Sequence, residues 1–155
     1  MDVYFPNSLR LPIKIGIEKG AVKFIKFSSF DKRAIGSISD PCALGAIKEL
    51  EEYFSGRLKK FHTKISPDGT PFQKKVWREL AKVEYGETIT YGELAKRIGE
   101  PKSCRAVAGA LHKNPIAIML PCHRIVAANG KLGGFAGGIA VKKFLIDLEK
   151  SATEY

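Results

Sequence analysis

Apolar and polar residues alternate near the start of the chain. Ile13, Ile15 and Ile17 are separated by single polar or small residues, a period of two that is typical of a strand with one buried face. Glu18-Lys-Gly-Ala21 then predicts a turn, and residues 22–27 resume the strand pattern. The chain is therefore predicted to begin with two strands joined by a tight turn.

Further along, the spacing of the apolar residues changes to that of a helix. Residues 42–54 carry apolar side chains on one helical face, and a polar stretch that contains Pro and Gly, residues 62–70, is typical of a linker. These patterns predict an α+β chain. A small N-terminal α/β support domain, residues 1–65, is expected to precede a mainly helical domain, residues 66–155.

Three helices are predicted after this linker. Thr70-Pro-Phe-Gln73 is a capping box with Pro at the first helical position, and apolar residues recur at near-helical spacing as far as Gly86. A second capping box, Thr90-Tyr-Gly-Glu93, begins a short helix that ends at the Gly99-Glu-Pro101 turn. Residues 102–113 form the third helix. This arrangement is typical of a helix-turn-helix, although many helical domains that do not bind DNA share it.

The third predicted helix has two different faces. One face is predicted to pack in the core: Cys104, Val107, Ala108 and Leu111. The opposite face combines basic residues with small ones: Arg105, Ala106, Gly109, His112 and Lys113. Small side chains around Gly109 would allow a close approach to a groove, where Arg105 and Lys113 could meet phosphates or base edges. The alternative is an ordinary solvated helix face.

Composition narrows the class of protein. The chain has 155 residues, 45% of them apolar, which is enough for a packed core. Its net charge of +10 is spread over both halves and fits either a nucleic-acid partner or a basic surface without a partner. The chain contains no run of 18 apolar residues, and its first residues lack the pattern of a signal peptide, so neither a membrane span nor a signal peptide is expected. Three sparse cysteines favour a reducing, cytoplasmic setting without disulfides or a zinc site.

The candidate chemistry lies at Cys122. Pro121 drives the residue before it toward an extended conformation, so the cysteine is predicted at the end of a short strand or turn. His123 and Arg124 follow at once, and a nearby cation lowers the pKa of a thiol. Neighbouring side chains on an extended chain point in opposite directions, so a bridging water or a remote group is needed to couple Cys122 to His123. An inert buried cysteine is the alternative.

The end of the chain contains a glycine-rich stretch and one more helix. Asn129-Gly130 predicts a tight turn, and the glycines up to Gly138 either bring backbone amides close to a ligand or form a plain flexible loop. Residues 140–150 are predicted to be helical, and Glu149 near their end could reach back to orient a histidine. The predicted buried residues of this helix are Val141, Phe144, Leu145 and Leu148.

Several motifs closely resemble those of the O6-alkylguanine-DNA alkyltransferases, also called methylated-DNA–protein-cysteine methyltransferases. The motifs are Leu120-Pro-Cys-His-Arg-Ile-Val126, Ile89-Thr-Tyr-Gly-Glu-Leu-Ala95, Arg105-Ala-Val-Ala-Gly-Ala-Leu111, Lys113-Asn-Pro115 and Gly137-Gly138. They lie in register between Thr70 and Glu149, whereas the first 70 residues resemble the family only loosely.

The resemblance implies a ribonuclease H-like N-terminal domain and a winged helix-turn-helix domain that carries the active site. It implies DNA repair by direct reversal on double-stranded DNA. O6-alkylguanine, mainly O6-methylguanine and also O4-alkylthymine, would be flipped out of the duplex, and its alkyl group would pass irreversibly to the protein. The protein would be a self-inactivating, cytoplasmic, DNA-associated monomer that needs no cofactor, no metal and no membrane.

The resemblance also implies catalytic roles for five residues. Cys122 would accept the alkyl group. His123 would polarise the thiol through a water, and Glu149 would orient His123. Asn114 would brace the turn that carries the thiol. Tyr91 would press on the adjacent phosphate and donate a proton toward N3 of the leaving guanine.

For DNA, the resemblance implies that Arg105 enters the duplex and occupies the space of the flipped nucleotide. Ala136 would offer its amide near O6. The remaining positions implied in DNA or substrate binding are Ala106, Gly109, Lys113, Arg124, Ile125 and Phe135. Phe135 stands where many members carry Tyr, and Ala136 where Ser is common, which affects how the pocket treats bulky groups.

Three other functions fit part of the sequence. A non-catalytic alkyltransferase-like protein would bind damaged DNA, but such relatives lack the cysteine that is present here at position 122. A winged-helix transcription regulator would explain the helices and the charge, but not Pro-Cys-His-Arg or the glycine-rich loop. A cysteine hydrolase would need a direct pairing of Cys122 and His123 and an oxyanion hole that the sequence does not indicate.

Overall fold

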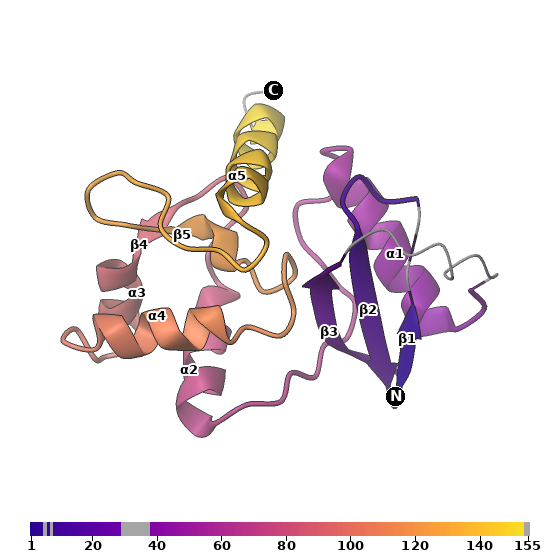
Figure 1. Cartoon of the computed structure of the whole chain (residues 1–155), viewed down its shortest axis with the longest axis horizontal. Helices are drawn as coiled ribbons and strands as arrows, with labels where there is room; N and C mark the ends of the chain where they lie inside the picture. Colours follow the sequence, from indigo (N-terminus) through magenta and orange to yellow (C-terminus); the bar gives the residue numbers. More distant parts are fainter. Residues whose placement is uncertain (5, 7, 29–37, 154–155) are drawn as a thin grey trace. The chain divides into compact units, whose positions relative to one another are not determined.

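The computed structural model of the chain divides into two compact units (Figure 1). It describes residues 1–4, 6, 8–28 and 38–153. Unit 1 comprises Met1–Asp68 with Pro115–Ala117, and unit 2 comprises Gly69–Asn114 with Ile118–Tyr155. The chain therefore passes from unit 1 to unit 2, returns to unit 1 for three residues, and ends in unit 2.

Unit 1 contains an antiparallel three-stranded sheet in the order β1-β2-β3. The strands are β1 (Asp2–Tyr4), β2 (Ile13–Glu18) and β3 (Ala21–Phe27). The predicted hairpin of β2 and β3 is confirmed, and its turn places Lys19 and Gly20 in the left-handed region at φ 51° and 72°. The pairing of β1 with β2 was not predicted.

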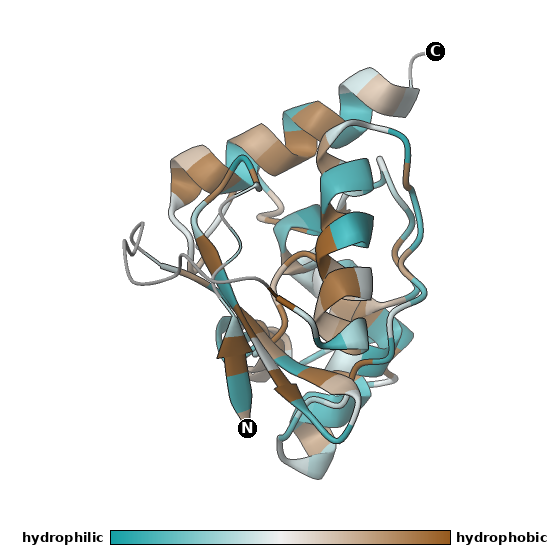
Figure 2. Ribbon diagram, turned by 90° about the vertical axis from the view of Figure 1, so that its right-hand side faces the viewer, coloured by the Kyte–Doolittle hydropathy of each residue, from teal (hydrophilic) through white to brown (hydrophobic). Residues whose placement is uncertain are grey.

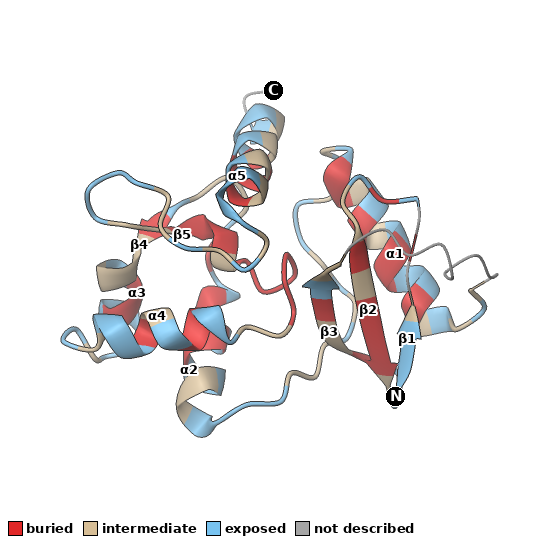
Figure 3. Ribbon diagram, in the orientation of Figure 1, coloured by how far each residue is buried: buried red, intermediate tan, exposed pale blue. Residues whose placement is uncertain are grey.

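One helix packs on this sheet. Helix α1 (Pro41–Phe54) begins after Asp40, whose carboxylate accepts a hydrogen bond from the Ala43 amide at 2.8 Å. It ends before Gly56, which has a φ of 79°. The helix contacts β2 and β3, and buried segments run along both strands and along the helix (Figure 3). The helix predicted over residues 42–54 is therefore confirmed.

Unit 2 is mainly helical. Its elements are α2 (Pro71–Leu80), β4 (Ile89–Thr90), α3 (Tyr91–Arg97), α4 (Cys104–His112), the 3₁₀ turn η2 (Cys122–Arg124), β5 (Ile125–Val126) and α5 (Ile139–Thr153). Strands β4 and β5 pair in parallel and were not predicted. Hydrophilic and hydrophobic segments alternate along α5, the helix that leads to the C-terminus (Figure 2). The predicted mixture of a small sheet and helices is confirmed.

The predicted capping signals begin two of these helices. Thr70 and Gln73 form the complete capping box of α2. Thr90 accepts a hydrogen bond from the Glu93 amide at 3.1 Å at the start of α3. Helix α2 ends at Leu80, however, and does not continue toward Gly86, because the chain turns there while Val83 still packs in the core.

The core face of α4 differs from its prediction. Val107, Ala110 and Leu111 are buried, whereas Cys104 is exposed and Ala108 is only partly buried. Cys104 is the first residue of the helix and lies one turn before Val107, the first buried residue, so the prediction that it packs in the core is wrong. Trp77 on α2 donates its indole N–H to the carbonyl of Ala110 at 2.9 Å and fixes the two helices together.

Candidate active site

Cys122 begins a single 3₁₀ turn that immediately precedes β5. Pro121 before it has φ −82° and ψ 63°, and the Cys122 amide donates to the carbonyl of Leu120 at 2.8 Å. This tight geometry is an inverse γ-turn. The side chain is partly buried. The predicted turn around Cys122 is therefore present, and no strand leads into it.

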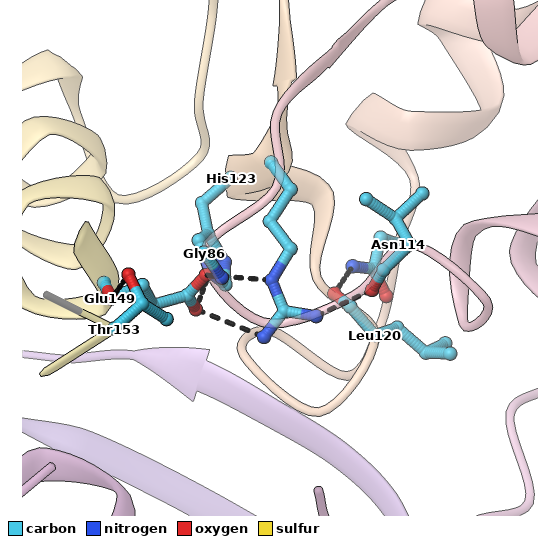
Figure 4. A network of polar contacts seen from close by, with 8 residues as sticks. Gly86, Asn114, Leu120, His123, Glu149 and Thr153 are labelled. Atoms are coloured by element: carbon cyan, nitrogen blue, oxygen red, sulfur yellow. Dashed lines mark hydrogen bonds and ion pairs between the residues drawn. The ribbon is translucent and has the colours of Figure 1, made fainter. Parts of the chain in front are cut away.

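The segment before the cysteine is held in an unusual conformation. Ile118 is buried with a φ of 72°, a left-handed value that a β-branched residue rarely adopts and that costs about 1–3 kcal/mol. The side-chain amide of Asn114 donates to the carbonyl of Leu120 at 2.8 Å (Figure 4). Asn114, two residues after the end of α4, is thus tied directly to the turn that carries Cys122.

His123 and Glu149 form a buried pair. Nε2 of His123 lies 2.6 Å from Oε2 of Glu149, and both side chains are almost completely shielded from solvent (Figure 4). The 3₁₀ turn directs His123 toward α5, which carries Glu149 in its last turns. A ring nitrogen this close to a carboxylate carries the hydrogen, so in the neutral ring Nδ1 is the acceptor.

Arg124 shares the same carboxylate. Its Nε and Nη2 donate to the two oxygens of Glu149 at 2.8 and 3.0 Å, and its Nη1 donates to the carbonyl of Val83 at 2.7 Å. The residue is only 6% exposed. In this conformation the guanidinium is occupied inside unit 2, so the binding of DNA or substrate by Arg124 stays a prediction.

Two opposite effects set the protonation of this network. Burial raises the pKa of Glu149, but the hydrogen bonds and charges of His123 and Arg124 outweigh it and lower that pKa to about 2. Burial lowers the pKa of His123 more than Glu149 raises it. At neutral pH the network therefore consists of a carboxylate, a neutral imidazole and a guanidinium, and the imidazole is able to accept a proton.

The thiol of Cys122 is poised by opposing influences. Burial raises its pKa. The Asn114 side chain, the positive charge of Lys142 and the backbone amides of Cys122 and His123 act in the other direction, since each stabilises the thiolate. Burial thus favours the neutral thiol, while the surrounding donors and the Lys142 charge would stabilise a thiolate once it forms.

Lys142 is the residue that the sequence analysis missed. It is fully buried, and its Nζ donates to the carbonyls of Ile125 and Gly134 at 2.6 and 3.2 Å. The ammonium also lies 6.0 Å from the centre of the Tyr91 ring. Burial lowers its pKa, and the nearby Cys122 opposes that shift. Lys142 thus joins the strand after Cys122 to the glycine-rich loop.

A pattern in the sequence could have revealed Lys142. The buried residues of α5 are Lys142, Leu145, Ile146 and Glu149, which follow the i, i+3, i+4, i+7 spacing of one helix face. The predicted face, with Val141, Phe144 and Leu148, is shifted by one position, and these three are only partly buried. Lys142 and Glu149 stand at the two ends of this otherwise apolar face, and charged residues at such positions are buried when both have partners.

Tyr91 lies beneath the glycine-rich loop. Gly133 has a φ of 75°, and a Cβ at this position would lie 2.7 Å from the Tyr91 hydroxyl, so only glycine fits. Burial and the nearby Cys122 raise the pKa of Tyr91, although the Gly134 amide opposes them. The phenol is therefore protonated at neutral pH and can donate.

The other predicted DNA-facing residues lie on α4 and on the loop. On α4, an exposed face carries Arg105, Ala106, Gly109 and His112, and Lys113 follows directly at its C-terminal end. On the loop, Phe135 is partly buried and Ala136 is exposed. Ile125 is buried, and its carbonyl accepts the bond from Lys142.

The site residues fall within a segment that matches a known family. The profile described as 6-O-methylguanine DNA methyltransferase, DNA binding domain, matches residues 71–151, more than half of the chain. The chain belongs to this family.

Individual members of the 6-O-methylguanine DNA methyltransferase family are clearly similar. The methylated-DNA–protein-cysteine methyltransferase of Methanosarcina acetivorans is 57% identical over 106 residues, which cover 68% of each protein. That of Mycobacterium bovis is 50% identical over 113 residues, covering 72% of this chain and 68% of the relative. The crystal structure of Mycobacterium tuberculosis OGT in complex with DNA superposes with a TM-score of 0.86 at 37% identity and covers 97% of this chain and 93% of that one.

Two further findings concern the class of protein. Within the part of the chain that the structure describes, His, Cys, Asp and Glu side chains do not gather in groups of three that could hold a metal ion. Over the same residues, every helix is too short or too polar to cross a membrane.

Proposed function

We propose that this protein repairs O6-alkylguanine in double-stranded DNA by direct reversal, with Cys122 as the alkyl acceptor. The observation that carries this proposal is the combination of family membership with a cysteine next to a buried His123–Glu149 pair. Sγ attacks the alkyl carbon, so an S–C bond forms as the C–O6 bond breaks. Guanine departs as an anion and takes up one proton. Because the product is a thioether, each molecule acts once.

The chain supplies groups for both proton transfers. His123 accepts the thiol proton through a bridging water, and Glu149 stabilises the imidazolium that forms. Tyr91, protonated and close to Cys122, donates toward N3 of the leaving guanine. The buried ammonium of Lys142 adds positive potential at the thiolate. These roles require no metal or cofactor.

The substrate must leave the base stack to meet a partly buried thiol. Flipping costs a few kcal/mol and is easier for a damaged base that pairs poorly. In this proposal α3 and α4 form a helix-turn-helix, and the small residues Ala106 and Gly109 allow α4 to approach the minor groove. Arg105 then fills the space of the flipped nucleotide, and Lys113 contacts the backbone.

The two predicted domains have different tasks in this proposal. Residues 66–155 form a winged helix-turn-helix domain that binds DNA and transfers the alkyl group, and the loop after β5 is its wing. The family match over residues 71–151 supports this division. Residues 1–65 form a support domain with the ribonuclease H-like fold that the family resemblance implies.

The reaction can be followed directly. The protein is incubated with a duplex that carries O6-methylguanine labelled in its methyl group, and the label is mapped by mass spectrometry. We expect one label per protein, on Cys122. Label that remains on the DNA or appears on another residue overturns the proposal, and turnover well above one per protein overturns single use.

Arg105→Ala separates flipping from chemistry. The variant should react with a methylated duplex at least roughly tenfold more slowly, since losing about 1.4 kcal/mol of the flipping energy has this effect. Its reaction with a free O6-alkylguanine base should be unchanged, because no base needs to be flipped. Single-turnover rates with both substrates test this, and equal losses in the two assays would argue against the wedge role.

A further inference from the structure

The outer edge of β3 binds two other segments of unit 1. Val22 donates to the carbonyl of Lys64 at 2.9 Å and accepts from the amide of Ser66 at 2.8 Å. Ile25 donates to the carbonyl of Pro115 at 2.9 Å and accepts from the amide of Ala117 at 3.1 Å. Both pairings are parallel. The same strand edge therefore makes two equivalent attachments, one to each segment.

The second attachment lies next to the active-site turn in the chain. Pro115–Ala117 directly follows Asn114 and directly precedes Ile118, whose left-handed φ of 72° begins the path to Cys122. At the other side, Asn114 binds the carbonyl of Leu120 at 2.8 Å. The segment that leads to the nucleophile is thus held at two places. Residues 115–117 are bonded to β3, and Leu120 is bonded to the Asn114 side chain.

Packing reinforces the hydrogen bonds at this attachment. Ile25 is 1% exposed, and Ile116 is fully buried. The backbone hydrogen bonds align residues 115–117 with β3, and the burial of Ile25 and Ile116 holds this segment in the core. A strained residue such as Ile118 keeps its conformation only when its surroundings hold it there. The attachment to β3 supplies such a restraint immediately before it.

We infer that β3 braces the nucleophile, with Ile25 as a positioning residue for Cys122. The edge of β3 holds residues 115–117, which set the start of the strained turn and so the place of the sulfur. This inference rests on the proposed function, since it assigns unit 1 a part in that reaction. A purely structural role for the attachment predicts instead that it stabilises unit 1 without affecting Cys122.

The two attachments of β3 provide a matched comparison. Ile25→Ala loosens the attachment to residues 115–117, and Val22→Ala loosens the equivalent one to residues 64–66. Single-turnover rates are measured with a methylated duplex and with a free O6-alkylguanine base, together with the affinity for undamaged DNA. We expect Ile25→Ala to react roughly tenfold or more slowly with both substrates, because small displacements of a reacting group have large effects on rate. The affinity for DNA stays unchanged, and Val22→Ala reacts at the wild-type rate.

Two measurements guard against a folding defect. Ile25→Val removes a single methyl group and should show a smaller loss of rate in the same direction. Hydrogen exchange at the Ala117 amide should accelerate in Ile25→Ala but not in Val22→Ala. Equal rates for folded Ile25→Ala and Val22→Ala would overturn the inference. Absence of transfer by the wild-type protein would instead overturn the proposed function, while the exchange result would still report on the brace.

Discussion

Cys122→Ser is expected to abolish alkyl transfer while the protein still binds DNA. A serine hydroxyl ionises far less readily than a thiol, so the groups that stabilise the thiolate of Cys122 gain no anion to act on. The rate should fall by at least about a thousandfold, as for removal of other nucleophiles. Transfer of a labelled methyl group to the protein measures the rate, and a gel-shift titration measures the affinity for DNA.

The other two cysteines provide the control. Cys42→Ser and Cys104→Ser change a partly buried and an exposed thiol that the proposed reaction does not use. Both variants should transfer the label at the wild-type rate. Transfer that persists in Cys122→Ser, or that is lost in Cys104→Ser, would place the acceptor elsewhere. Undiminished binding of damaged DNA by a wild-type protein that transfers nothing would favour the non-catalytic alternative.

Local signals in the sequence predicted the framework of the site. Thr70 and Thr90 begin their helices as their capping patterns indicated, and the hairpin of β2 and β3 follows the alternation of its isoleucines. These features depend on residues a few positions apart, so the sequence contains them directly. Glu149 also lies next to His123, as the family resemblance implied.

Features that depend on distant parts of the chain were not predicted. Lys142 resembles a surface lysine until the carbonyls of Ile125 and Gly134 are known to lie beside it. The sequence places Arg124 two residues after Cys122, but it does not show that Val83 and Glu149 accept hydrogen bonds from the Arg124 side chain. Both charged side chains are buried because tertiary structure provides their partners.

The same limit applies to backbone conformation and to exposure. Nothing in the residue type of Ile118 indicates a left-handed φ, and the hydrogen bonds that hold the chain on either side of it are known only from the structure. Cys104 falls on the apolar side of a helical wheel but at the exposed first position of the helix. The wheel gives the direction of a side chain and contains no information on where the neighbouring helices end.

Glu149→Gln should destabilise the protein by about 3–5 kcal/mol, because it leaves the buried guanidinium of Arg124 without a counter-charge. The amide also cannot stabilise an imidazolium on His123, so alkyl transfer should slow by about a hundredfold or more. Urea unfolding at neutral pH measures the loss of stability. Single-turnover kinetics on the folded protein measures the loss of rate.

The lowered pKa values of Glu149 and His123 determine the direction in which stability changes with pH. The pKa of Glu149 falls from an ordinary 4.5 to about 2 on folding, so its contribution is fully present above pH 4.5 and is lost as the pH falls toward 2. The pKa of His123 is also lowered from its ordinary 6.5, so protonation of His123 opposes folding once the pH drops below that value. Wild-type stability should therefore decline from about pH 6.5 downward and most steeply below 4.5. In Glu149→Gln, the steep decline of stability below pH 4.5 should be absent.

A surface carboxylate separates this effect from a general loss of charge. Glu87 pairs with Arg97 at 3.3 Å, and both side chains are more than one-third exposed, so Glu87→Gln removes the same charge where water screens it. This control should lose less than about 1 kcal/mol and keep the wild-type dependence on pH. Equal losses in the two variants would mean that Glu149 acts as an ordinary surface charge. The large difference we expect arises because only Glu149 has to neutralise a guanidinium and orient an imidazole away from water.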